Sequence, residues 1–249
     1  MNKNNPLQVL YGRDRKANVL LKFYPEAYER LISIDGLETA YESIKRTKDL
    51  GMIATCMARS FVRSQRRFYE GGRLLFAWAD IQFGKDALTP CTFPPTQVEA
   101  QSLLSQFLLP PSLVLQTKAK LQSFWLLDRP MYTRSEIERL QAQTLLMRLH
   151  DYFAVLAAEA GWQNDNSCNL MHQITLAGAT GPRPIGKIEL ANVLESRPDC
   201  RYSAGAIEAA CEVSAVRNKA VMKLQNKLNR LTGQSQTPYL AQSQKSRWF

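Results

Sequence analysis

The amino-acid sequence predicts an α+β fold with a central sheet flanked by helices. Two short apolar runs, 74–79 and 110–115, are rich in Leu, Val or aromatic residues and are bounded by turn-forming residues. Such runs are typical of buried strands. We therefore expect strands at 74–82, 113–117 and 122–127, the last two joined by a short turn. Apolar residues at helical spacing elsewhere predict the helices around this sheet.

The N-terminal part shows one clear helical pattern. Residues 1–20 are polar and basic, so we expect a surface segment or an arm. Pro25 suits the first turn of a helix, which we expect from about Glu26 to Ile34. A second helix is predicted by the helical spacing of Leu37, Ala40, Tyr41 and Ile44. The apolar run 52–61 does not distinguish helix from strand.

Capping patterns predict the helices that follow. Thr96 with Glu99, and Thr133 with Glu136, have the form of capping boxes. The second box begins a long helix that we expect to end at Gly161. Its apolar face consists of Ile137, Leu140, Leu146, Leu149, Phe153 and Leu156. Further strands are expected within 168–176 and 187–194, and Ser203 marks the expected start of a last helix.

The chain is expected to have three parts. An α+β domain covers residues 1–205, a basic amphipathic helix covers 206–231, and a mobile tail covers 232–249. Four basic residues of that helix, spaced four, four and three apart, share one face: Lys219, Lys223, Lys227 and Arg230.

The net charge of +10 is concentrated toward the two ends of the chain. Residues 1–73 carry 14 basic and 8 acidic side chains, and residues 213–249 carry 7 basic side chains and no acidic one. Residues 74–212 carry 11 basic and 14 acidic side chains. Such one-sided ends suit a polyanion. We expect a nucleic-acid partner, and the alternative is that the charge serves solubility alone.

Arginines alternate with aromatic residues just before the first apolar run. Arg59, Arg63, Arg66 and Arg67 lie close to Phe61, Phe68 and Tyr69. Guanidinium groups can hold phosphates while rings stack on the bases of a single strand. Alternatively, Phe61 and Phe68 belong to the core and the arginines are solvated.

The cysteines and the hydropathy pattern bear on the compartment. The five cysteines are scattered without a C-x-x-C pair, which predicts a reducing cytoplasm and no structural zinc. No apolar run reaches the about 20 residues that a membrane helix needs, so we expect no membrane partner.

Three stretches resemble a known family. They are Phe76-Ala-Trp-Ala-Asp-Ile-Gln-Phe-Gly-Lys85, Pro110-Pro-Ser-Leu-Val-Leu115 and Phe124-Trp-Leu-Leu-Asp-Arg-Pro130. In order and spacing they are similar to the archaeo-eukaryotic primase superfamily, in particular its RepB-like and prim-pol-like branch from plasmids and phages. The resemblance covers roughly residues 60–205. It implies a primase-like (RRM-like) catalytic core followed by a C-terminal helical segment.

The resemblance also implies a degenerate catalytic site. The family's Asp-x-Asp motif corresponds to Asp80 and Gln82, and its phosphate-binding histidine corresponds to Gln122. Two glycines of its second motif correspond to Lys118 and Lys120. The polar positions of its third motif correspond to Asn169, His172 and Thr175, and its proline to Ala177. Mg²⁺ pairs need several converging carboxylates. We therefore expect no metal and no cofactor.

Together these features predict a DNA-binding replication protein of a plasmid, phage or other mobile element that has lost nucleotidyl transfer. DNA is expected rather than RNA. The expected phosphate contacts are Arg59, Arg63, Arg66, Arg67, Lys118, Lys120, Lys219, Lys223, Lys227 and Arg230. One alternative is an active primase or polymerase that uses Mg²⁺ or Mn²⁺ at Asp80 with relocated ligands. Another is a structural subunit that docks a replication-protein partner through the C-terminal helix.

Overall fold

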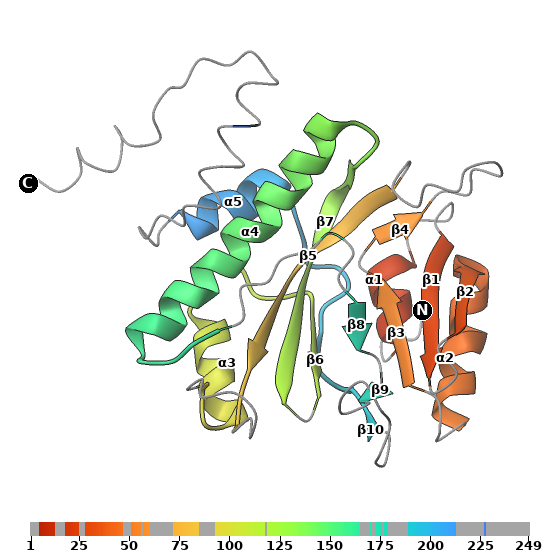
Figure 1. The fold of residues 1–249 in the computed structure, drawn as a ribbon, viewed down its shortest axis with the longest axis horizontal. Coiled ribbons are helices and arrows are strands. Elements are labelled where there is room, and N and C mark those ends of the chain that lie inside the picture. Colours follow the sequence, from red (N-terminus) through yellow and green to blue (C-terminus); the bar gives the residue numbers. More distant parts are fainter. Residues whose placement is uncertain are drawn as a thin grey trace, which may run out of the picture.

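The computed structural model shows a large sheet with helices around it (Figure 1). It describes residues 5–12, 18–24, 28–46, 51–55, 57–59, 72–84, 93–117, 119–164, 170, 173–175, 177–178, 189–212 and 227. The predicted α+β class is confirmed by these elements. None of the described helices is long and apolar enough to cross a membrane.

The main sheet follows the order β11-β6-β7-β5-β4-β1-β3-β8 through antiparallel pairs. Its strands are β1 (Asn18–Tyr24), β3 (Gly51–Thr55), β4 (Met57–Arg59), β5 (Gly72–Gln82), β6 (Leu113–Gln116), β7 (Lys120–Tyr132), β8 (Gln173–Thr175) and β11 (Asn192–Ser196). In addition, β2 (Tyr28–Ser33) pairs with β1, and β12 (Arg201–Tyr202) pairs in parallel with β7. A separate pair consists of β9 (Ala177–Gly178) and β10 (Glu189–Leu190).

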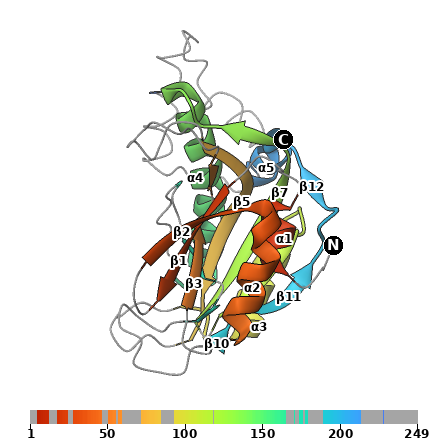
Figure 2. The same ribbon diagram turned by 90° about the vertical axis from the view of Figure 1, so that its right-hand side faces the viewer.

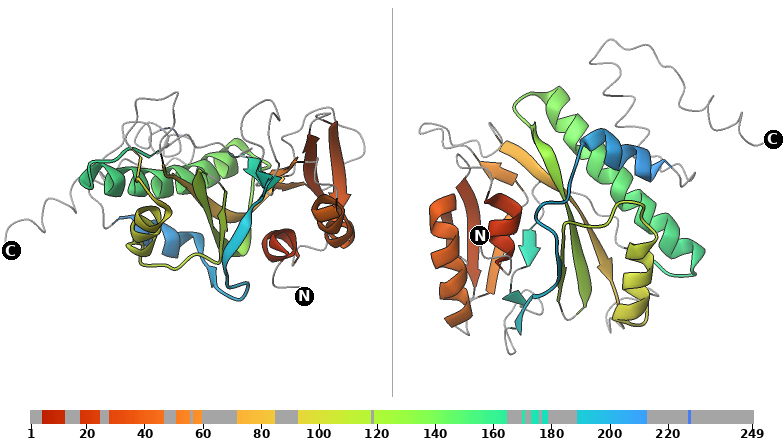
Figure 3. Two further views of the ribbon diagram at one scale, coloured as in Figure 1. Left: turned by 90° about the horizontal axis from the view of Figure 1, so that it is seen from below. Right: turned by 180° about the vertical axis from the view of Figure 1, so that it is seen from behind.

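The helices form two groups. Figure 1 shows α3 (Gln97–Ser105), α4 (Glu136–Glu159) and α5 (Ala204–Cys211) together on one side of the strands. On the other side, α1 (Pro6–Tyr11) and α2 (Leu37–Arg46) lie close to each other beside the N-terminal strands (Figure 2). Helices α4 and α5 pack side by side (Figure 3), with the Arg148 guanidinium 3.7 Å from the Glu208 carboxylate.

Aromatic side chains join the central strands to the helices. On β7, the Trp125 ring lies 5.3 Å from Phe107, just after α3, and 5.9 Å from Phe153 on α4. On β5, the Trp78 ring lies 4.3 Å from the imidazole of His150 on α4. These three ring contacts bury large apolar surfaces, and the burial of apolar surface is the main favourable term in folding. The core therefore holds β5 and β7 in place from several directions.

The structure corrects two expectations in the N-terminal part. The helix expected at 26–34 is wrong, because residues 28–33 form β2 and pair with residues 18–23 of β1. The aromatic and branched side chains of this stretch suit a strand as well as a helix, and the pairing partner decides. Residues 1–20 are not simply a surface arm, since α1 is capped by the Asn5 side chain and buries Leu7 and Tyr11.

The predicted capping boxes also need correction. Thr96 precedes α3, but its hydroxyl donates to the Glu99 carboxylate and caps no backbone N–H. The box before α4 lies two residues later than expected, between Ser135 and Glu138. Thr133 does not cap this helix, and its N–H and hydroxyl both donate to the Gly72 carbonyl.

The expected last helix begins as predicted. Ser203 caps α5, and its hydroxyl oxygen accepts from the Ala206 N–H at 3.1 Å. The described helix crosses the expected boundary between residues 205 and 206, and Ile207 and Cys211 are buried against the core. Apart from residue 227, the expected helix beyond 212 and the tail at 232–249 lie outside the described residues.

One buried serine ties the strand ends together. The Ser112 hydroxyl donates to the Cys200 carbonyl at 2.8 Å and accepts from the Leu126 N–H at 2.9 Å. Its own N–H donates to the Phe124 carbonyl, and its carbonyl accepts from the Arg197 N–H, both at 2.7 Å. Ser112 thereby connects β6, β7 and the turn between β11 and β12.

Replacing this serine tests its role. Ser112→Ala removes the hydroxyl and leaves the Cys200 carbonyl and Leu126 N–H without that bond. We expect the free energy of unfolding, measured by urea denaturation, to fall by about 1–3 kcal/mol. Ser105→Ala, whose hydroxyl bonds the Ser102 carbonyl on the surface, should change it by less than about 0.5 kcal/mol. Equal effects of both changes would contradict the role of Ser112.

Candidate functional site

Four polar residues form a block where β5 ends and β7 begins. In the antiparallel register Asp80 faces Gln122, and Gln82 faces Lys120. Facing residues project to the same side of a sheet, and so do alternate residues of one strand. All four side chains therefore share one face. Asp80 and Gln122 are buried, whereas Gln82 and Lys120 are partly exposed.

The central interaction of this block is an ion pair across the two strands. The Lys120 ammonium donates to Asp80 Oδ2 at 2.5 Å. The side chains are only 23% and 11% exposed, respectively. Hydrogen bonds between charged groups are stronger than neutral ones, and reduced contact with water strengthens the attraction. The carboxylate of Asp80 is thus held by a cation that belongs to the protein.

The turn between β6 and β7 positions Lys120. The Thr117 N–H and hydroxyl both donate to the Lys120 carbonyl, at 2.9 and 3.2 Å. The turn is also joined to the residue after β5, because the Phe83 N–H donates to the Ala119 carbonyl at 2.9 Å. Next, Gly84 adopts a φ of 85°, which favours glycine, and its N–H donates to the Pro94 carbonyl at 2.8 Å. These bonds fix the backbone on both sides of the ion pair.

The residues of this block do not fit a pair of divalent metal ions. Mg²⁺ prefers hard oxygen ligands, and two such ions need several converging carboxylates. Asp80 supplies one carboxylate, which already binds the Lys120 ammonium. Gln82 and Gln122 carry no charge. Within the described ranges, no group of three or more His, Cys, Asp and Glu side chains could hold a metal ion.

The structure brings together only part of the predicted site. Asp80, Gln82 and Gln122 lie in one block, as the strand register requires. Lys120, expected to contact phosphate, is paired with Asp80. Lys227 pairs with Glu136 at the start of α4, with 2.5 Å between Nζ and Oε1.

Other predicted residues remain untested by the structure. Arg59 lies in β4, where only its backbone position is described. Thr175 and Ala177 of the third motif lie in β8 and β9. The remaining predicted positions lie outside the described residues: Arg63, Arg66, Arg67, Lys118, Asn169, His172, Lys219, Lys223 and Arg230.

The sequence analysis does not predict the pairing of Asp80 with Lys120, although the sequence contains a signal for it. A tight turn between Thr117 and Lys120 sets where β7 begins. Once β7 is aligned antiparallel with β5, Lys120 lies two residues before the partner of Asp80. A lysine at this diagonal position can reach the carboxylate of a neighbouring strand. Lys120, at the second position where the resembled family has a glycine, therefore supplies the counterion of Asp80.

Comparisons with known proteins place the chain beside primase domains. The structure is similar to the primase-polymerase domain of cyanophage S-2L, with 17% sequence identity, a TM-score of 0.49, and coverage of 82% of this chain and 94% of that chain. It is also similar to primase RepB′, with 12% identity, a TM-score of 0.46, and coverage of 93% of this chain and 68% of that chain. The catalytic domain of RepB′, solved in complex with initiator DNA, shows 14% identity, a TM-score of 0.44, and coverage of 93% and 99%. No protein-family model and no curated protein matches the chain. These similarities concern the course of the backbone.

A double-mutant cycle tests the ion pair. Asp80→Asn or Lys120→Met each leaves one partly buried charge without its partner, so either change should lower the free energy of unfolding by about 1–3 kcal/mol. The double variant should lose less than the sum, with a coupling energy of about 1–2 kcal/mol. Urea unfolding of the four proteins measures these values.

An exposed ion pair provides the control for this cycle. Glu195 and Arg197 approach to 3.1 Å with side chains 39% and 45% exposed, and their coupling energy should be below about 1 kcal/mol. A coupling energy near zero for Asp80 and Lys120 would contradict the account of the site.

Proposed function

We propose that the chain is a nucleic-acid-binding replication protein of a plasmid, phage or other mobile element, built on a primase-like domain that has lost nucleotidyl transfer. One observation carries the proposal. The Lys120 ammonium binds Asp80, the acidic residue to which the family resemblance assigns metal binding. The positive charge that divalent ions supply in such sites is here a fixed part of the chain.

Electrostatics explains why this arrangement opposes nucleotidyl transfer. The reaction needs cations that bridge protein carboxylates and the phosphates of the nucleotide. A divalent ion at Asp80 has to compete with an ammonium only 2.5 Å from the carboxylate oxygen. Gln82 and Gln122 add no negative charge to offset that competition. The block suits a stable joint between two strands better than a metal centre.

Nucleic-acid binding is supported by the charge distribution. The ends of the chain are basic, with 14 basic and 8 acidic residues in 1–73 and 7 basic and no acidic residues in 213–249. Phosphates attract such segments at long range, and their binding releases counterions. DNA is the proposed partner because the resemblance is to primases that act in DNA replication.

Salt dependence tests the binding proposal. Fluorescence anisotropy with labelled single-stranded DNA, duplex DNA and RNA at increasing NaCl gives the affinity at each concentration. We expect the logarithm of the association constant to fall linearly with the logarithm of salt, with a slope of about −2 or steeper, because several phosphates are neutralised. Affinity that does not respond to salt, or no binding to any of these probes, would contradict the proposal.

Primer synthesis and primer extension test the loss of activity. With Mg²⁺ or Mn²⁺, nucleoside triphosphates and a single-stranded template, we expect no product from the wild-type chain. A product that disappears in Asp80→Ala but persists in the exposed control Glu159→Gln would establish the active primase instead. This result leaves the binding measurement unaffected, so binding and catalysis can fail independently.

A further inference from the structure

Tyr132, the last residue of β7, presents an aromatic ring to solvent. The residue is 41% exposed. Among the described residues the other large apolar side chains with high exposure, Val98 and Leu108, are aliphatic. The guanidinium carbon of Arg134 lies 4.4 Å from the centre of the Tyr132 ring. This distance is within the range of a cation–π interaction.

The backbone that carries this ring is firmly held. The N–H and hydroxyl of Thr133 donate to the Gly72 carbonyl at 3.0 and 2.9 Å, and Thr133 is fully buried. Tyr132 itself faces Arg73 across the pair of β7 and β5. A tyrosine side chain has few rotatable bonds, so a ring on such a support loses little conformational entropy when it binds a ligand.

The two acidic residues in the first turn of α4 are engaged by neighbouring donors. Glu138 Oε2 accepts from the Arg134 and Ser135 N–H groups, both at 2.8 Å. The hydrogen bond from Ser135 is the main cause that lowers the pKa of Glu138. The Glu136 carboxylate binds the Lys227 ammonium. Arg139 adds a further cation, since its guanidinium donates to the Arg134 carbonyl at 3.4 Å.

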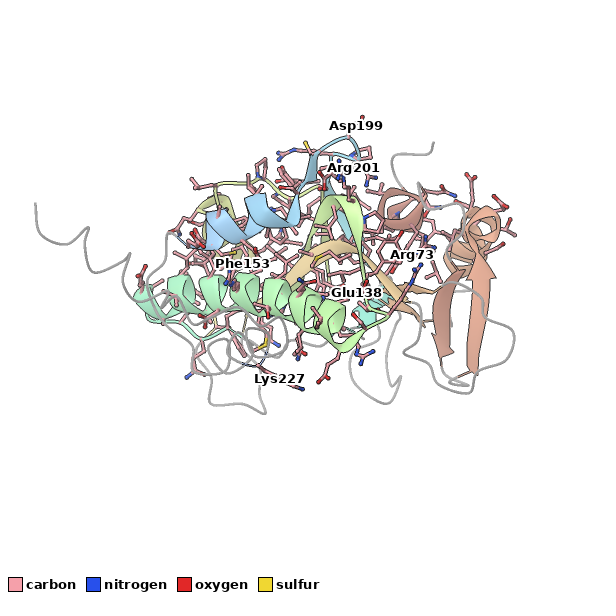
Figure 4. The ribbon with its side chains drawn as sticks, turned by 90° about the horizontal axis from the view of Figure 1, so that it is seen from above. Arg73, Glu138, Phe153, Asp199, Arg201 and Lys227 are labelled. Carbon is pink, nitrogen blue, oxygen red and sulfur yellow. The ribbon has the colours of Figure 1, made fainter. Side chains whose placement is uncertain are left out.

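Parts of the chain that are far apart in sequence meet at this corner. Arg59 of β4 faces Gly72 of β5, and Gly72 is bonded to Thr133. Lys227, from the basic C-terminal segment, reaches the first turn of α4 through Glu136. Figure 4 shows Arg73 and Glu138 toward the end of α4 where the helix begins. Arg59 belongs to the basic N-terminal part of the sequence and Lys227 to the basic C-terminal part.

We propose that Tyr132 and Arg134 form a stacking site for an unpaired base of a single nucleic-acid strand, with the Arg134 guanidinium also contacting phosphate. The inference rests on the proposed nucleic-acid binding and specifies its ligand. In a duplex each base is stacked between its neighbours, whereas the face of an unpaired base is free to stack on a protein ring. Arg134 lies over one face of the Tyr132 ring, so the base stacks on the opposite face with the cation close to it.

Binding of a fluorescein-labelled oligothymidine of about 20 nucleotides, long enough to cover a typical single-strand site, tests the inference by anisotropy. Tyr132→Ala should weaken binding about 10-fold, the usual effect of one lost stacking contact, without changing the salt slope. Tyr132→Phe should bind like the wild type because the ring is retained. Arg134→Gln should weaken binding and make the salt slope shallower by about one.

Leu108→Ala is the matched control, because it removes an exposed apolar side chain elsewhere and should leave binding unchanged. Thermal unfolding of each variant shows whether the fold is retained. If the alanine variant unfolds, Arg134→Gln carries the test, and unchanged binding by that variant overturns the stacking site. If the wild type binds with steep salt dependence and Tyr132→Ala binds equally well, the stacking site is overturned while the proposed function stands. If the wild type binds no nucleic acid, both are overturned. Equal losses in Leu108→Ala and Tyr132→Ala also overturn the stacking site.

Discussion

The ion pair between Asp80 and Lys120 is the interaction on which the functional account depends. It joins the end of β5 to the start of β7, where both backbones are already fixed by strand pairing and by the turn at Thr117. A cation built into the chain differs from a bound metal ion in two respects: it is tethered to the backbone, and it donates hydrogen bonds where a metal ion would coordinate carboxylate and phosphate oxygens. An ion pair of this kind holds the two strands together but does not replace the divalent cations that phosphate chemistry needs.

The rest of the fold is held by contacts that do not depend on that chemistry. Aromatic packing of Trp125 with Phe107 and Phe153 fixes α3 and α4 against β7. The hydrogen bonds of Ser112 connect β6, β7 and the turn between β11 and β12. None of these contacts uses Asp80, Gln82, Lys120 or Gln122, so they do not depend on the charges of the polar block. The exposed Tyr132 at the far end of β7 then offers a binding surface that requires no metal.

Local patterns in the sequence predict the central elements well and the partners of those elements poorly. The three central strands and the long helix follow from apolar runs and helical spacing, which are properties of neighbouring residues. The sequence predicts a helix where β2 lies, because spacing within one segment does not reveal its pairing with β1. The sequence predicts the capping box at Thr133, two residues before its actual position at Ser135. Thr133 instead bonds the carbonyl of Gly72, which lies 61 residues away in the sequence. The sequence likewise identifies the four polar residues one by one. The pairing of Lys120 with Asp80 becomes visible only when the register of β5 against β7 is known.

The most direct measurement of the central claim is a crystal structure of the wild-type chain grown with millimolar MnCl₂, with anomalous scattering used to locate manganese. The account predicts no anomalous peak at Asp80 and a Lys120 ammonium within hydrogen-bond distance of the Asp80 carboxylate. A manganese ion bound to Asp80, with the Lys120 side chain displaced from it, would contradict the account and restore a metal-dependent function to the site.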